Sequence, residues 1–99
     1  MESSPSLRQL ALVDQLRPFV SDEAAYGRMY ADFHDLLEAC AWLLKTFSDH
    51  EGRSLNPSEL EDLLVDIDVK FIEHVSFHLQ SLHKDLTATL ENFPDQEGA

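Results

Sequence analysis

The stretch YGRMYADFHDLLEACAWLLKTF, residues 26–47, decides the fold of this chain. Its apolar residues recur at alternating steps of four and three, which is the spacing along one face of an α-helix. This seam consists of Tyr26, Tyr30, Phe33, Leu37, Cys40, Leu44 and Phe47. Beside the seam, apolar residues at every seventh position widen it, namely Met29, Leu36 and Leu43. The pattern predicts a long helix whose apolar stripe is broad enough to contact two neighbours.

Helix-end signals predict one helix before this stretch and one after it. The first helix is short and ends ahead of Pro18, which cannot donate a helical hydrogen bond. The second begins at a cap, Ser21 or Asp22, and ends before Gly52, since glycine readily takes the left-handed conformation that terminates helices. A capping box of Asn56 and Glu59 then opens a third helix. No helix breaker follows until Pro94, so this helix is expected to be long, with a kink or break as the alternative.

These elements predict an all-α fold, an antiparallel helical hairpin of two long helices plus a short N-terminal helix. A tight turn near Arg53 sets a register in which Leu37 faces Phe71 and His34 lies level with His74. The short first helix cannot cover both long helices, so dimerisation is expected to complete a four-helix-type bundle. Residues 1–99 form a single helical domain, with 1–5 and 94–99 expected to be flexible tails.

The charge of the chain is strongly negative. Seven Lys and Arg residues stand against 19 Asp and Glu residues, a formal charge of −12. This surface repels nucleic-acid phosphates and anionic membranes, so neither is an expected partner. The remaining attractive partner is a basic protein, and the alternative is that the charge serves solubility alone. A single cysteine, Cys40, and the lack of a secretory or membrane-spanning segment predict a cytoplasmic protein, with Cys40 buried in the seam.

The start of the third helix carries a cluster of acidic residues. Its candidate partner-binding face consists of Glu59, Glu61, Asp62 and Asp66. The alternative interpretation is complementation of the helix dipole by solvated carboxylates. Trp42 lies off the seam of the second helix and is a possible interface anchor, or is covered by the first helix or a second copy.

Three histidines offer a possible metal site. His74 and His78 are spaced i, i+4, which lets two imidazoles meet one ion, and the predicted register adds His34. Iron or zinc is the cofactor under this alternative, whereas no cofactor is expected otherwise. If these histidines bind no metal, we expect His78 to border the apolar stripe with one ring nitrogen in solvent, and His74 to be exposed.

No activated nucleophile, nucleotide-binding loop or paired catalytic carboxylate is present in the sequence, so we do not expect an enzyme. The expected function is a small acidic regulatory protein of the inhibitor, antitoxin or immunity, chaperone or anti-regulator type, acting through helical surfaces on a basic partner. The alternatives are a metal-binding helical bundle and a structural subunit of a larger assembly.

Overall fold

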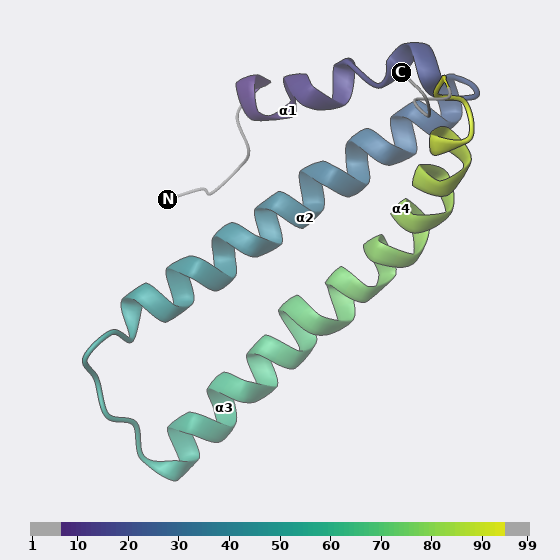
Figure 1. The fold of residues 1–99 in the computed structure, drawn as a ribbon. Helices are drawn as coiled ribbons and strands as arrows, with labels where there is room; N and C mark the ends of the chain where they lie inside the picture. Colours follow the sequence, from purple (N-terminus) through teal and green to yellow (C-terminus); the bar gives the residue numbers. More distant parts are fainter. Residues whose placement is uncertain (1–6, 95–99) are drawn as a thin grey trace.

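A computed structural model describes residues 7–94, and these residues form helices joined by short turns, with no strand among them (Figure 1). The order is α1 (Leu7–Asp14), the 3-10 turn η1 (Arg17–Phe19), α2 (Glu23–Asp49), α3 (Pro57–Ile67), the π-helical turn η2 (Asp68–Glu73) and α4 (His74–Leu90). The last three form one continuous helical run, so the predicted third helix is present with a local interruption. The expected tails, 1–5 and 94–99 apart from Pro94, lie outside the described residues.

The helix ends follow the local signals in the sequence. Asp22 caps α2 by accepting a hydrogen bond of 2.8 Å from the backbone N–H of Ala25. Asn56 and Glu59 form the complete capping box of α3, each side chain accepting from the backbone N–H of the other. Gly52 adopts a left-handed φ of 75° after α2. These three predictions are confirmed.

Helix α2 packs against two neighbours, α1 on one side and α4 on another, as its wide apolar stripe predicts. Leu10 and Val13 of α1 form a buried cluster with Tyr26, at the beginning of the seam. Farther along, Leu44 is 70% exposed and Phe47 is 62% exposed. Because α1 is only eight residues long, it covers only the first turns of α2.

Cys40 corrects one prediction, because the structure leaves this residue exposed instead of buried. The cause is the same short α1, which lines the seam only as far as Leu37. The thiol is therefore open to solvent.

Polar contacts fix η1 and the end of α1 to the start of α2. The Tyr26 hydroxyl donates a hydrogen bond to the Asp14 carboxylate, which raises the pKa of Tyr26. Arg17 lies over the Tyr26 ring, 3.9 Å from its centroid, and donates to both carboxylate oxygens of Glu23 at 2.9 and 2.8 Å. These contacts hold α1 against α2 where the apolar area alone is small.

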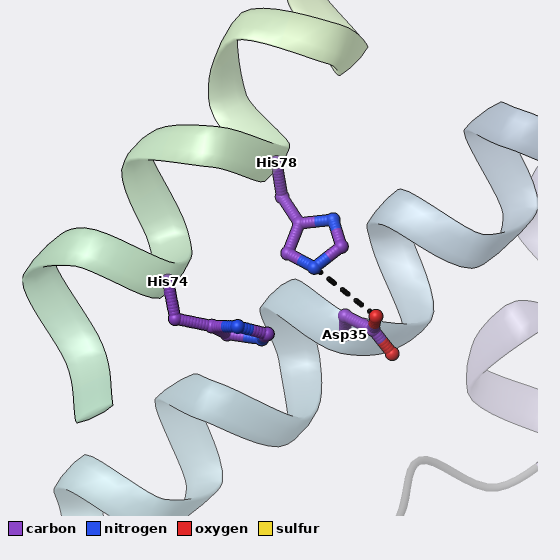
Figure 2. Close-up of side chains that lie close together, drawn as sticks. All are labelled: Asp35, His74 and His78. Carbon is purple, nitrogen blue, oxygen red and sulfur yellow. Dashed lines mark ion pairs between the residues drawn. The ribbon is translucent and has the colours of Figure 1, made fainter. Parts of the chain in front are cut away.

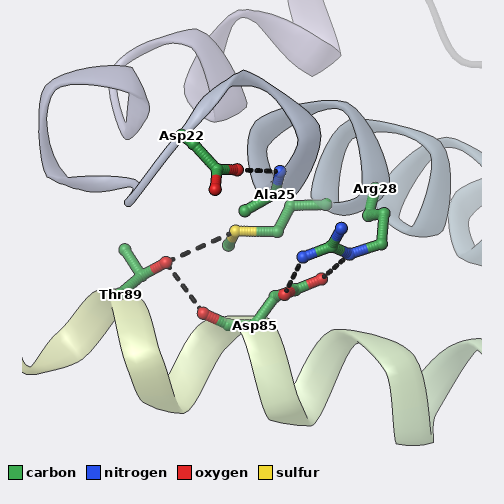
Figure 3. A network of polar contacts seen from close by, with 6 residues as sticks. Asp22, Ala25, Arg28, Asp85 and Thr89 are labelled. Atoms are coloured by element: carbon green, nitrogen blue, oxygen red, sulfur yellow. Dashed lines mark hydrogen bonds and ion pairs between the residues drawn. The ribbon is translucent and has the colours of Figure 1, made fainter.

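The interface between α2 and α4 combines one fully buried side chain with a polar network (Figure 3). Met29 is 0% exposed, and its sulfur lies 3.5 Å from the hydroxyl of Thr89. That hydroxyl donates to the backbone carbonyl of Asp85 at 2.8 Å. The buried Asp85 carboxylate accepts two hydrogen bonds from Arg28, at 3.0 and 2.9 Å, and thereby raises the pKa of Arg28. Side-chain chemistry as well as apolar burial therefore sets the register of these two helices.

The two long helical segments lie side by side over α4 and η2 but separate over α3, so they do not form a regular hairpin (Figure 1). The predicted register was wrong. Leu37 lies near α1, while His78 of α4 lies opposite Asp32 and Asp35 of α2. The predicted register depends on a tight turn near Arg53. In the structure the end of α2 and the start of α3 lie apart (Figure 1), so the turn does not fix which residues of the two helical segments face each other.

Much apolar surface remains open to solvent. The exposed large hydrophobic residues are Leu12, Leu37, Leu44, Phe47, Leu60, Leu64, Val65, Val69, Ile72, Phe77, Leu79, Leu90 and Phe93. A single exposed apolar residue is ordinary, but contiguous patches mark interaction sites. None of the helices within residues 7–94 has the length and apolar character required to cross a membrane.

Candidate functional site

Three potential metal ligands meet between α2 and α4 (Figure 2). His78 of α4 is only 8% exposed, and its Nε2 atom lies 3.1 Å from Oδ2 of Asp35 on α2. His74, one turn earlier on α4, places its ring edge-on to that of His78, with centroids 4.6 Å apart. One ligand atom from each of the three residues lies within 4.8 Å of the others.

A second carboxylate holds the other side of the His78 ring. Asp32 is 5% exposed, and its Oδ1 atom lies 2.8 Å from His78 Nδ1. Its other oxygen, Oδ2, is a buried atom without a hydrogen-bond partner in the described part of the chain. A neutral imidazole has only one N–H group, so it cannot donate to both carboxylates. The ring satisfies Asp32 and Asp35 together as an imidazolium, as a neutral imidazole with one of the two carboxyl groups protonated, or with a cation at one of its nitrogens.

The structure changes the histidine set predicted from the sequence. His74 is exposed, as expected, but His78 has both nitrogens next to carboxylates instead of one in solvent. His34 does not join His74 and His78, because its Nδ1 atom contacts the other oxygen of Asp35 at 3.1 Å. Asp35 thus lies where the predicted register placed His34. Asp32 and Asp35 are spaced i, i+3 and could have been recognised in the sequence as partners of a histidine on the facing helix. The wrong register hid this, because it did not place them opposite His78.

Trp42 lies beside η2 and not against α1. It is half-buried and lines an open hollow next to the cluster, together with Asp35, Glu38, Ala39, Val69, Lys70 and His74. The Lys70 ammonium is 4.0 Å from the Asp66 carboxylate, one turn back along the run. Because Asp35 and His74 line the hollow, it gives solvent access to the cluster of Asp35, His74 and His78. Its wall includes part of a π-helical turn, a feature that frequently occurs at functional sites.

The predicted acidic face is exposed on α3, where all four carboxylates, Glu59, Glu61, Asp62 and Asp66, are at the surface. Two apolar hollows that share Leu60 lie beside it. One is lined by Pro57, Leu60, Glu61, Leu64, Val65 and Asp68, and the other by Thr46, Phe47, His50, Glu51, Arg53, Leu55, Leu60 and Leu63. We call these hollows with the four carboxylates the distal surface. Of the four carboxylates only Glu61 lines a hollow, beside Asp68, because an advance of about 100° per residue places Glu59, Asp62 and Asp66 toward the other side of α3. The first hollow thus has an apolar centre and an acidic border of two carboxylates, and an apolar centre with a polar rim is the usual anatomy of a protein interface.

A different groove runs between α1 and α2. It is lined by Gln9, Leu10, Leu12, Val13, Leu16, Phe33 and Leu37. None of these seven residues is charged, in contrast to the distal surface. We call it the α1–α2 groove.

Comparison with known proteins finds no matching protein family, curated protein or solved structure.

Proposed function

We propose that this chain is a small regulatory protein-binding module, without catalytic activity, whose distal surface takes a basic protein partner. The observation that carries the proposal is the apolar centre of this surface, with Leu64 and Val65 open to solvent beside the exposed carboxylates of Glu61 and Asp68. Burial of such a centre supplies affinity. The acidic border selects a partner with Lys or Arg around its own apolar residues and accelerates encounter.

Charge also supports a separate site for a second copy of the chain. In a two-fold symmetric dimer the same patch faces itself, so an acidic patch repels its counterpart. The α1–α2 groove is uncharged and carries the exposed side chains of Leu12 and Leu37. We therefore assign the homodimer to this groove, where two helices from each copy would form a four-helix-type core. The exposed thiol of Cys40 favours a reducing compartment such as the cytoplasm.

The test of the distal surface uses defined amphipathic helical peptides with one apolar face, flanked by Lys in one version and by Glu in the other. We expect the Lys version to bind and the Glu version to fail, with affinity falling as salt is added. The variant Glu61→Gln/Asp62→Asn should lose most of this binding. The matched control, Glu73→Gln/Glu91→Gln, removes the same charge elsewhere and should retain it. Equal binding by the two double variants would reject the distal surface as the partner site.

The dimer is tested separately by sedimentation velocity over a range of protein concentrations. Leu37→Lys places a charge in the α1–α2 groove and should give a monomer, whereas Val65→Lys in the distal surface should leave self-association intact. A wild-type protein that is monomeric at every concentration contradicts the dimer without affecting the partner proposal.

A further inference from the structure

We propose that Asp35, His74 and His78 form a binding site for one divalent transition-metal ion of the zinc type. The proposal concerns the interface of α2 and α4 and is independent of the distal surface. Two imidazoles and one carboxylate are ligands that Zn²⁺ and its first-row neighbours accept, and calcium or magnesium would require more oxygen atoms.

The spacing of the ligand atoms suits such an ion. Bonds of 2.0–2.1 Å place neighbouring ligands about 3.3 Å apart around a tetrahedral ion and about 2.9 Å apart around an octahedral one. The 3.1 Å between His78 Nε2 and Asp35 Oδ2 falls between these values. His74 comes from the preceding turn of the same helix, and its ligand atom is within 4.8 Å of both others. A change of side-chain torsion at the exposed His74 would complete the set.

The surrounding residues hold the ligands as they do in known metal sites. A metal-bound histidine commonly donates its other N–H group to a carboxylate, which fixes the tautomer and the ring orientation. Asp32 occupies this position at His78 Nδ1, and it is nine-tenths buried. On the far side, His34 contacts the second oxygen of Asp35.

Charge balance gives an independent reason for a cation. Asp32 and Asp35 bring two carboxylates to one imidazole, and one buried oxygen of Asp32 has no hydrogen-bond partner among residues 7–94. Buried carboxylates are costly unless a positive charge compensates them. Of the nearby cations, Lys70 extends toward Asp66, and Arg28, which also attracts Asp32, forms its ion pair with Asp85. A divalent ion between His78 and Asp35 would compensate both aspartates.

The site has three protein ligands and an open side. The hollow next to Trp42 would leave one coordination position to water, as in zinc sites that exchange ligands. Because the ligands come from both α2 and α4, a bound ion links the two helices and stabilises the folded state.

The experiment uses the full chain, freed of metal by a chelator and then titrated with Zn²⁺ in a calorimeter and with Co²⁺ by visible absorption. We expect one ion per chain and a higher melting temperature with Zn²⁺. His74→Ala should weaken Zn²⁺ binding at least tenfold without loss of helicity, because His74 is exposed. His83→Ala removes another exposed histidine of α4 and should bind like the wild type.

Two further variants separate ligands from supporting groups. Asp35→Asn should lose the ion and Asp32→Asn should weaken binding by about 10- to 100-fold, the usual effect of the supporting carboxylate. Failure of the wild type to take up Zn²⁺, or equal affinity in His74→Ala and His83→Ala, would overturn the site. Neither result bears on peptide binding at the distal surface.

Discussion

Met29 provides the sharpest test of the packing between α2 and α4. It is 0% exposed, and the whole of its side chain beyond Cβ is lost in Met29→Ala. Transfer of a buried side chain of this size contributes about 1.5–3 kcal/mol, and the cavity left behind adds to that. The free energy of unfolding should fall by about 2–5 kcal/mol, which is a large part of the about 5–15 kcal/mol that stabilises an ordinary domain.

Leu44→Ala is the matched control on the same helix. Leu44 lies in the seam, where sequence alone predicts a core residue, but it is 70% exposed. Because only about a third of the side chain is buried, only about a third of its transfer free energy is lost, and Leu44→Ala should lower the free energy of unfolding by only about 0.5–1 kcal/mol. The two substitutions thus separate the interface seen in the structure from the one that the heptad pattern favours.

Trp42 is the single tryptophan and is half-buried beside η2, so its fluorescence reports on this interface during urea denaturation. The measurement is made at low protein concentration, so that self-association does not bury Leu44. A loss of 2 kcal/mol should lower the melting temperature by at least about 8 °C for a domain of this size. If Met29→Ala and Leu44→Ala cost the same, the packing of α2 on α4 described above is incorrect.

Two further predictions concern the polar contacts. Arg28→Met leaves the buried Asp85 carboxylate without its partner and should destabilise the fold by about 1–3 kcal/mol in urea unfolding, while Arg28→Lys, which cannot form the two-pronged contact, should fall between it and the wild type. A neutral result for Arg28→Met would show that this ion pair does not form in solution. In a Tyr30→Phe background, Tyr26 is the remaining tyrosine, and its absorbance titration should lie above the ordinary pKa of about 10 because it donates to Asp14. A raised folded-state pKa means that the contact stabilises the fold fully below pH of about 10 and is lost as the pH rises through the folded-state pKa. Asp14→Asn should bring the titration back toward the ordinary value, and an identical titration in both proteins would contradict the hydrogen bond.

Local signals predicted the helix boundaries well because caps depend on residues close in sequence. The Asn56 and Glu59 box and the Gly52 terminator need no information about distant parts of the chain. The end of α1 was less accurate, because it stops at Asp14 and not just ahead of Pro18. The turn that follows satisfies backbone groups in a 3-10 geometry that the proline also allows.

The pairing of helices could not be predicted in the same way. The seam predicted that Cys40 packs in a core, yet the short α1 leaves it in solvent. The predicted ligand set was wrong in one member for the same reason, since an error of a few residues in the register put His34 in the place of Asp35, while His74 and His78 do come together. Buried polar pairs such as Asp32 with His78 set the register of α2 on α4, and the spacing of apolar residues gives no information about such pairs.

The π-helical turn η2 determines the direction in which α3 points. An α-helix advances about 100° per residue, and an i to i+5 turn holds one residue more than an i to i+4 turn. Because η2 takes up one extra residue within its wider turn, deleting one residue there would restore an uninterrupted α-helix with nearly the same relation between α3 and α4. Converting η2 to α-helical geometry with all its residues retained would instead rotate α3 by about 100° relative to α4. Glu61 and Asp62 would then border a different side of the molecule, while Leu82 and its neighbours on α4 kept their contacts with α2. The π-helical geometry of this one turn thus sets the angle between the distal surface and the cluster of Asp35, His74 and His78, so a change of helix type there would reorient one site without altering the residues of either.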